Sequence, residues 1–476
     1  MNPEDSHAAR AAPAVIGGSF RDRNGRVYIA EGRVFRGLSE RALDDYRALT
    51  GTEFHGEFVG KGRLIGSEIV PGDAVPLSGA EKAQWAAFLE HPCIPVISYP
   101  YEWTFGMLRD AALLQLDLTE AAILEDIGLK DATPYNIQFV DGRPVFIDIG
   151  SFERRQQGEP WAGYRQFCEL FLYPLMLQSY KGMNFQPMLR GNIDGIAVPD
   201  AARMFGLRDR FRRGVFSHVW LQSKLDRRYG GATVDMRSEL KSAGFSHELI
   251  LANIRKLRRL VNGLDWGGQG SEWGGYEEFH NYSERDAELK EAFVGHCVRE
   301  SGARMVWDIG CNTGRFSKIA ARHARSVLAM DQDHFAVERL YRELRQEDAT
   351  SILTLVQDVA NPSPNWGWRN RERSELSDRA RPDLVLCLAL IHHVVISAHI
   401  PLGEFVDWLA ELSDQVIIEF VSRDDDKVQA LLRNKRDDYT DYGREPLEAA
   451  LGRHFQIVRQ QALESGNRFL YWCRRV

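Results

Sequence analysis

The chain has 476 residues, a length that suggests two to four domains. Apolar residues make up 44% of it and charged residues 27%, which excludes disorder as its main state. The net charge of −7 disfavours a general electrostatic attraction to nucleic acid, and no apolar run is long enough to span a bilayer. The six cysteines stand singly and the N-terminus lacks an apolar signal region, so we expect a cytoplasmic protein without structural disulfides, zinc or a membrane partner.

The N-terminal third has the pattern of a mixed domain. Residues 1–25 are rich in Ala and Pro and predict a mobile tail. From Arg26 to Val75 apolar and polar residues alternate between Gly-rich turns, which predicts strands. A helical pattern begins at Trp103, and Asp141-Gly142 separates two strand-like runs, which predicts a hairpin. The sequence therefore predicts an α+β domain over 26–197, with strands first and helices later.

The next segment, 198–262, is helical in pattern and basic. It contains fourteen Lys and Arg against six Asp and Glu. One interpretation is a set of solvated helix faces, or a surface that docks on an acidic neighbouring domain. The other is a surface for an anionic ligand or a protein partner, with aromatic residues interleaved: Phe205, Phe211, Phe216 and Trp220. We expect this segment to bridge two domains, and the Gly- and Trp-rich stretch 263–279 to be a linker.

Beyond residue 280 strand-like and helical runs alternate. Such alternation predicts a parallel sheet covered by helices. Seven strand-like runs are present, at 306–310, 326–331, 352–358, 384–390, 415–421, 455–460 and 468–473. We therefore expect a Rossmann-like α/β domain with a seven-stranded sheet over 280–476.

Three acids end the first three of these runs. Asp308 is followed by Gly310 and Gly314, which permit a tight turn and the close approach of a ligand to the backbone. A carboxylate at this position suits a cation and disfavours a pyrophosphate. Asp331 lies where dinucleotide folds carry an acid that binds ribose hydroxyls, and Asp358 ends the third run, where it could bind an adenine amino group. S-adenosylmethionine carries an ammonium group, a carboxylate, a ribose and an adenine, so it matches this set.

This C-terminal part resembles class I S-adenosylmethionine-dependent methyltransferases, and more narrowly a bacterial group related to nodulation host-specificity methyltransferases. The resemblance rests on DIGCNTGRFS, ANPSPNWGWRNRER, PDLVLCLALIHHVVI and IIEFVSRDDDKVQALL. It departs at Asn312, where many members have Gly, although Asn tolerates the left-handed region. The implied cofactor-binding residues are Asp308, Gly310, Cys311, Asn312, Gly314, Asp331, Gln332, Asp358, Val359 and Leu388.

Methyl transfer needs an aligned nucleophile and often a base. His392 and His393 follow the fourth strand-like run, and histidine is the obvious base at neutral pH. Glu419 ends the fifth run and could orient a substrate or a histidine. The charged insertion 365–379 is expected to be a substrate wall or a solvated helix. No cluster of acids supports a metal-dependent methyl transfer.

A second constellation lies near the N-terminus. Asp131 and Asn136, followed by Asp148, have the spacing found in phosphotransferases, where they position a hydroxyl nucleophile and hold Mg²⁺. Residues 26–195 thus resemble a diverged kinase-like domain, similar to aminoglycoside phosphotransferases, which implies ATP and Mg²⁺ as ligands if the domain is active. Leu129 replaces the expected histidine, no Gly-rich phosphate loop is evident, and Lys61 is only one option for the ATP-binding lysine.

Taken together, the sequence predicts a methyltransferase that acts on an O or N atom of a small polar metabolite, a glycan or a natural product. The N-terminal domain would assist acceptor recognition. Two alternatives are a bifunctional methyltransferase and ATP-dependent phosphotransferase, and a non-catalytic S-adenosylmethionine-binding scaffold. A nicotinamide dehydrogenase is disfavoured because Asp308 would face the pyrophosphate. The oligomeric state is left open.

Overall fold

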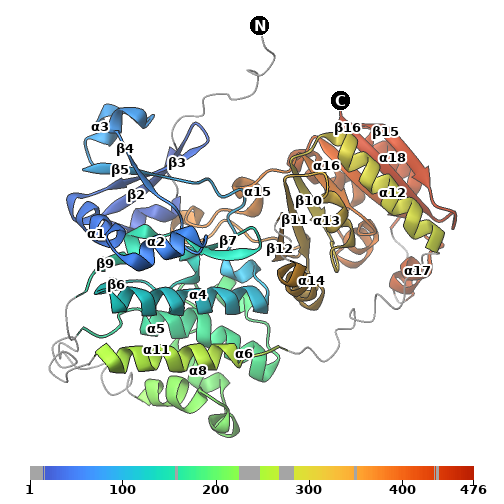
Figure 1. The fold of residues 1–476 in the computed structure, drawn as a ribbon. Helices are drawn as coiled ribbons and strands as arrows, with labels where there is room; N and C mark the ends of the chain where they lie inside the picture. Colours follow the sequence, from blue (N-terminus) through green and yellow to red (C-terminus); the bar gives the residue numbers. More distant parts are fainter. Residues whose placement is uncertain are drawn as a thin grey trace.

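The computed structural model describes residues 14–15, 17–155, 159–224, 247–266, 284–347, 351–433, 435 and 439–476. An N-terminal part with a small antiparallel sheet stands beside a C-terminal part with a large sheet (Figure 1). Most of the predicted linker and residues 1–13 of the predicted tail lie outside the described residues. Within the described chain, none of the helices is both long enough and apolar enough to cross a membrane.

The N-terminal sheet has five strands in the order β1-β2-β3-β5-β4, and every pair is antiparallel. Its strands are β1 (Ala14–Val15), β2 (Gly25–Ala30), β3 (Arg33–Leu38), β4 (Glu68–Val70) and β5 (Ala87–His91). Glu31 and Gly32, with φ of 52° and 73°, form the tight turn between β2 and β3. The described end of the predicted tail therefore reaches this sheet, because Ala14 and Val15 pair with β2.

The prediction of strands throughout 26–75 is wrong between residues 40 and 60. Two helices lie there, α1 (Glu40–Thr50) and α2 (Glu53–Gly60). Ser39 and Thr52 cap them by accepting backbone N–H groups, and Leu43, Tyr46 and Leu49 form a buried stripe at helical spacing. The helix-capping residues and the three-residue spacing of the buried side chains favour helices here. They outweigh the alternation of apolar and polar residues from which strands were predicted.

Helices form most of the remainder of the N-terminal part. The long helix α4 (Phe105–Leu124) begins close to the predicted start and is capped by Thr104. The predicted hairpin is confirmed as β7 (Ile137–Val140) and β8 (Arg143–Phe146), joined by Asp141 and Gly142 in left-handed conformations. The other elements are α3 (Gly79–Lys82), β6 (Ile127–Leu129), β9 (Phe152–Arg154), α5 (Tyr164–Phe167), η6 (Cys168–Leu172), α6 (Tyr173–Lys181) and α7 (Gln186–Gly191).

The basic segment forms helices in its described parts. These are α8 (Val198–Met204), η7 (Leu207–Phe211), η8 (Phe216–Leu221) and α11 (His247–Asn262). The helix α11 lies along α4 (Figure 1), where Arg255 and Arg258 form ion pairs with Glu120. Part of the basic surplus is thus neutralised within the N-terminal part. The residues after α11 reach the C-terminal part, where Trp266 stacks on Phe335 at 4.2 Å between ring centroids.

The predicted seven-stranded sheet is confirmed. Its order is β12-β11-β10-β13-β14-β16-β15, and β16 is the strand that runs antiparallel to both of its neighbours. The strands are β10 (Met305–Ile309), β11 (Ser326–Asp331), β12 (Ile352–Val356), β13 (Leu384–Cys387), β14 (Gln415–Val421), β15 (Phe455–Ala462) and β16 (Arg468–Arg475). The helices around it include α12 (Glu284–Ser301), α13 (Arg315–Ala320), α14 (His334–Glu347), α15 (Leu376–Arg379), α16 (Leu402–Leu412), α17 (Asp426–Leu432) and α18 (Arg444–Leu451).

Both faces of this sheet are buried. Successive residues of β10 alternate between two apolar clusters, with Val306 in one and Trp307 in the other. The first cluster contains residues of α12 and α13, and the second contains residues of α16 and α18. The second cluster also continues into the N-terminal part, so the two parts share one core.

Three histidines, buried His91 and half-buried His218 and His334, make the fold sensitive to acid. Burial lowers the pKa of His91, His218 and His334 to about 4, below the value of the unfolded chain. The unfolded state therefore binds more protons between about pH 4 and pH 6.5, and stability falls as the pH drops through this range, by about 1–2 kcal/mol per histidine at about pH 5. Burial of Asp308 raises its pKa to about 6, which opposes part of this loss.

We expect urea unfolding at about pH 5 to show a clearly lower midpoint than at about pH 7, and His91→Asn to reduce that difference. His323, which is exposed, supplies the matched control His323→Asn. A midpoint that is equal at both pH values would contradict the assignment of neutral buried histidines.

Candidate active site

The candidate site lies at the carboxyl edge of the large sheet. The strand order reverses between β10 and β13, and open α/β sheets bind ligands in the crevice at such a reversal. Two loops meet there, residues 310–314 after β10 and residues 388–393 after β13. Ala389 has φ of 53°, an uncommon conformation for a residue with a Cβ, and such strain is concentrated at functional sites.

The loop after β10 has the conformation that its glycines permit. Gly310 and Gly314 have φ of 78° and 81°. A Cβ at Gly314 would lie 2.4 Å from Leu340 Cδ1, so this position leaves no room for a side chain. Asn312 has φ of 50°, which agrees with the expectation that Asn can replace Gly here.

The three predicted acids lie at the ends of neighbouring strands. Asp308 is 2% exposed, accepts a hydrogen bond from Ser317 Oγ at 2.5 Å, and has its pKa raised to about 6 by burial. Asp331 accepts the backbone N–H groups of Asn312 and Asp333, each at 2.9 Å, and burial raises its pKa. Asp358 is half-buried after β12.

The remaining predicted cofactor residues surround these acids to different degrees. Cys311 and Leu388 are buried, Val359 is half-buried and Gln332 is exposed. Burial raises the pKa of the Cys311 thiol, so this cysteine is a neutral apolar group at physiological pH.

The two histidines after β13 differ in exposure. His392 is 2% exposed, whereas His393 is half-buried, and their ring centroids lie 4.3 Å apart. Burial lowers the pKa of both rings, so both are neutral near pH 7. The positive charge of Lys427 lowers the pKa of His393 further, and burial lowers the pKa of Lys427 itself to about 8. His393 is therefore the better placed of the two to meet a substrate.

Glu419 is fully buried and engaged by two cations. Its Oε2 lies 2.6 Å from Lys290 Nζ, and its Oε1 lies 3.3 Å from Arg468 Nη1. Arg468 in turn pairs with Asp425 at 2.8 Å. Both carboxylate oxygens of Glu419 thus have cationic partners within the protein, and its expected role in orienting a substrate or a histidine stays a prediction.

Sequence reasoning missed Lys290, Arg468 and Lys427. Lys290 lies in α12, far from the glycine loop in the sequence, and no motif marks it. The signal that could have drawn attention to Arg468 is its position in the apolar run of β16, where a charged residue with 3% exposure requires a partner.

The insertion 365–379 is not a solvated helix, because its α-helix is only the short α15 and both Glu372 and Leu376 are buried. It packs on the N-terminal part, where Arg379 forms an ion pair with Glu102 at 2.5 Å and Trp366 contacts the ring of Tyr101 edge-on at 5.9 Å. Arg21, in the described end of the predicted tail, binds Glu372 at 2.7 Å. Arg379, Glu372 and Trp366 thus serve contacts between the two parts, whereas Trp368 is 65% exposed.

In the N-terminal part the structure brings the predicted phosphotransferase residues together. Asn136 Nδ2 donates to Ser151 Oγ at 3.0 Å, and Ser151 Oγ donates to Asp148 Oδ2 at 2.6 Å. The charge of Asp148 contributes to the raised pKa of Asp131, although burial is the larger cause.

These residues do not fit a magnesium site. Arg36 Nη1, on β3, lies 2.7 Å from Asp148 Oδ1, so the carboxylate already has a cationic partner on one oxygen and a hydroxyl donor on the other. Among the described residues no group of three His, Cys, Asp or Glu side chains could hold a metal ion. Lys61 follows α2 and pairs with exposed Glu57, whereas Arg36 is the cation that pairs directly with Asp148.

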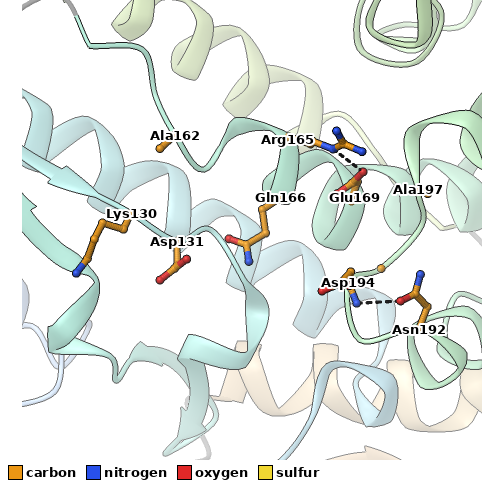
Figure 2. Close-up of a pocket in the computed structure, with 10 residues that line it drawn as sticks. Lys130, Asp131, Ala162, Arg165, Gln166, Glu169, Asn192, Asp194 and Ala197 are labelled. Atoms are coloured by element: carbon orange, nitrogen blue, oxygen red, sulfur yellow. Dashed lines mark hydrogen bonds and ion pairs between the residues drawn. The ribbon is translucent and has the colours of Figure 1, made fainter. Parts of the chain in front are cut away.

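A polar pocket of about 600 Å³ lies beside Asp131 (Figure 2). Asp131 and Lys130 form one side of it, and an ion pair between Arg165 and Glu169 faces them. The other lining residues are Ala162, Gln166, Asn192, Asp194, Gly195 and Ala197. Arg190 lies two residues before the lining residue Asn192. It donates to the carbonyl oxygens of Asn361 and Pro362 in the loop that follows Asp358.

Comparison with known proteins gives one close relative. No family model matches the chain. Among solved structures, the chain is similar to the N-methyltransferase NodS from Bradyrhizobium japonicum WM9, with 13% identity over 40% of this chain and 98% of that chain and a TM-score of 0.30. It is also similar to magnesium protoporphyrin IX methyltransferase ChlM from Synechocystis PCC 6803 with bound SAM, with 18% identity over 44% of this chain and 87% of that chain and a TM-score of 0.29. At these TM-scores neither similarity supports a conclusion about this chain.

The similarity to the nodulation protein NoeA of Rhizobium meliloti (strain 1021) is of a different order. The two sequences are 32% identical over 471 residues, which cover 98% of each chain. Both the N-terminal and the C-terminal parts are therefore shared, and the chain belongs to the family of the nodulation protein NoeA.

Proposed function

We propose that this protein is an S-adenosylmethionine-dependent methyltransferase that acts on an O or N atom of a small polar metabolite, a glycan or a natural product. The single observation that carries the proposal is the set of Asp308, Asp331 and Asp358 at three adjacent strand ends, beside a left-handed glycine loop at the reversal of strand order. The seven-stranded sheet also agrees with the Rossmann-like fold that the resemblance to class I methyltransferases implies.

The residues suit this cofactor. Asp308, when ionised, would bind the ammonium group, and Asp331 would bind ribose hydroxyls from the end of β11. Asp358 would bind near the adenine amino group. A Cβ at Gly314 would collide with Leu340, so the loop can keep its tight left-handed turn only with glycine at this position. When bound, S-adenosylmethionine supplies an electrophilic methyl group.

The chain's own contribution to the reaction is alignment and proton removal. His393 is neutral and half-buried beside the crevice, so it can accept the proton of an acceptor hydroxyl or amine. His392 packs beneath it, and the buried ion chain through Lys290, Glu419 and Arg468 holds α12, β14 and β16 in register behind the site.

For the N-terminal part we infer a role in acceptor recognition on a kinase-like scaffold. The five-stranded antiparallel sheet, the helix α1 after β3 and the hairpins around Asp131 and Asp148 support this relation. The pocket beside Asp131 offers carboxylates, amides and two cations to a polar ligand. Because Arg36 pairs with Asp148, phosphate transfer with Mg²⁺ is not part of the proposal.

The test is the affinity for S-adenosylhomocysteine, measured by calorimetry. Asp331→Ala should weaken binding by about 1–3 kcal/mol, the cost of losing charged hydrogen bonds. Asp331→Asn serves as a second variant, because it retains an acceptor for the loop N–H groups, and the exposed Asp378→Ala serves as the matched control.

Two results would overturn the proposal. If folded wild-type protein does not bind S-adenosylhomocysteine, the proposal that S-adenosylmethionine is the cofactor is wrong. If Asp331→Ala binds S-adenosylhomocysteine with the affinity of the wild type, the proposal that Asp331 binds the ribose hydroxyls is wrong. Binding without formation of S-adenosylhomocysteine from S-adenosylmethionine, across acceptors of all three classes, would favour the scaffold alternative.

A further inference from the structure

A group of large apolar side chains is exposed on the basic segment. Phe211 is 94% exposed, Leu207 is 68% exposed and Phe216 is 60% exposed. Leu221, at the end of η8, is 47% exposed. A soluble surface rarely carries several such side chains within fifteen residues without a binding role. We call η7, η8 and the turn between them the Leu207–Leu221 surface.

The Leu207–Leu221 surface is one continuous structure. The short helix η7 packs against η8, and the Arg210 guanidinium carbon lies 3.4 Å from the centroid of the Trp220 ring. Phe216 and Trp220 are four residues apart and therefore share a face of η8. Exposed Phe211 directly follows Arg210, so the apolar tips and the arginines are interleaved.

The same surface is strongly positive. Residues 198–224 contain six Lys and Arg against two acids. Both acids already have cationic partners, since Asp200 binds Arg203, and Asp209 binds Lys181 and Arg212. The positive charge that remains, on residues such as exposed Arg208 and Arg213, is therefore uncompensated by the acids of this segment and stands out in a chain with a net charge of −7.

The position of the surface separates it from the candidate active site. The segment around α8 forms the end of the N-terminal part that lies away from the seven-stranded sheet (Figure 1). It is also distinct from α11, whose Arg255 and Arg258 are bound by Glu120. The exposed apolar tips therefore serve neither the cofactor crevice nor the contact between the two parts.

We propose that the Leu207–Leu221 surface binds the surface of an anionic lipid bilayer. Protruding Leu and Phe tips among arginines match the acyl boundary and the phosphate layer of such a membrane. A single-stranded nucleic acid would use the charges and would stack on the two Phe rings, but it would leave Leu207 and Leu221 without an apolar partner. The sequence predicts no membrane partner because it contains no spanning run, but a peripheral contact needs none.

The test is co-sedimentation of the full chain with vesicles. Vesicles of phosphatidylcholine with phosphatidylglycerol should bind the protein, and vesicles of phosphatidylcholine alone should bind it far more weakly. Binding should fall as salt is raised, because the arginine contribution is screened. The double variant Phe211→Ser/Phe216→Ser should reduce the fraction bound at least about tenfold, because it removes two buried aromatic groups from the bound state.

Control variants test whether vesicle binding is specific to the Leu207–Leu221 surface or is nonspecific hydrophobic adsorption. Ile69→Ser changes another exposed apolar side chain, 54% exposed on β4, and should bind as the wild type does. Arg208→Gln/Arg213→Gln should reduce binding at low salt without changing the thermal midpoint. The proposal is overturned if the wild type does not bind the anionic vesicles, or if Phe211→Ser/Phe216→Ser binds them as well as the wild type does. It is also overturned if the protein binds an RNA oligonucleotide but not the vesicles.

Discussion

The variant Arg379→Met is expected to lose about 3–5 kcal/mol of folding stability, because it leaves Glu102 as an unpaired charge in a buried site. The side chains of Arg379 and Glu102 are 4% and 0% exposed, and two guanidinium nitrogens approach the carboxylate at 2.5 and 3.1 Å. The guanidinium also donates to the Ile97 carbonyl and lies 4.3 Å from the centroid of the Tyr99 ring.

Urea unfolding followed by tryptophan fluorescence would measure this loss. Arg381→Met is the matched control, because Arg381 is exposed in the same loop. Glu102→Gln should also destabilise the chain, and the double variant Glu102→Gln/Arg379→Met should recover part of the loss, since no unpaired charge remains. A midpoint for Arg379→Met within error of the Arg381→Met midpoint would contradict the predicted cost.

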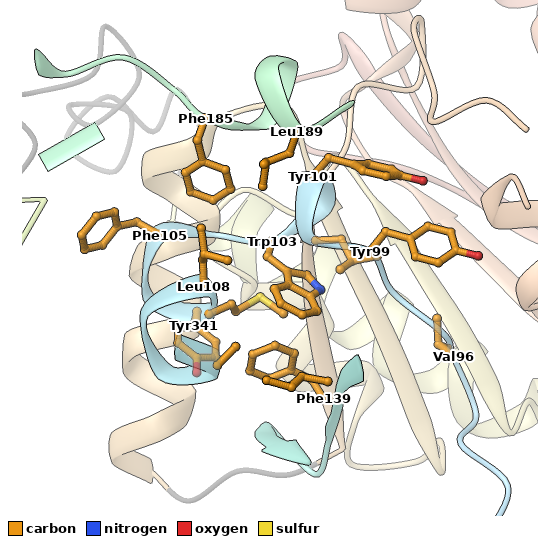
Figure 3. Packing of buried hydrophobic residues seen from close by; sticks show 14 of the residues in the cluster. Val96, Tyr99, Tyr101, Trp103, Phe105, Leu108, Phe139, Phe185, Leu189 and Tyr341 are labelled. Carbon is orange, nitrogen blue, oxygen red and sulfur yellow. The ribbon is translucent and has the colours of Figure 1, made fainter. Parts of the chain in front are cut away.

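Further contacts at the same interface join the N-terminal and C-terminal parts. Figure 3 shows aromatic residues before and within α4 packed together with Tyr341 of α14. Tyr341 also donates to Asp110 at 2.8 Å, and its ring meets Phe139 edge-on at 6.1 Å. Glu338, one turn earlier on α14, accepts the backbone N–H of Gly106. Because α14 follows Asp331 and the insertion follows Asp358, the N-terminal part supports two elements of the proposed cofactor site.

The sequence predicted the large sheet well because parallel strands have a strong signature. Strands buried on both faces read as apolar runs, and their ends carry the polar groups, so Asp308, Asp331 and Asp358 could be assigned to one edge. The left-handed conformation of Asn312 was also predictable, because few other residues with a Cβ adopt it.

Long-range pairing could not be predicted in the same way. The insertion 365–379 has the composition of an exposed helix, but its charges are bound by Glu102 and Arg21, which are far away in the sequence. Similarly, Arg36 occurs in an ordinary strand pattern, and only the fold places it beside Asp148. The sequence around a charged residue does not show whether an oppositely charged residue will lie beside it in the fold.

Lys290→Met is expected to make the proposed cofactor site sensitive to pH in the neutral range. Burial raises the pKa of Asp308 to about 6, and the nearby positive charge of Lys290 opposes that rise. Without this charge the pKa of Asp308 should rise further. If ionised Asp308 holds the ammonium group of the cofactor, binding is strong above its pKa and is lost as the pH falls through it. Wild-type affinity should therefore fall only near about pH 6, whereas the variant should lose affinity already near about pH 7.

Calorimetry with S-adenosylhomocysteine between about pH 5 and pH 8 would separate this effect from a structural one. Lys290→Arg retains a cation and should keep the break in affinity near that of the wild type. A defect caused only by the loss of the 2.6 Å contact with Glu419 would weaken binding by the same factor at every pH. If the affinity of Lys290→Met changes with pH in parallel with that of the wild type, Lys290 does not control the ionisation of Asp308. A break shifted to higher pH would identify Lys290 as the residue that keeps Asp308 ionised, and so as a positioning residue of the site.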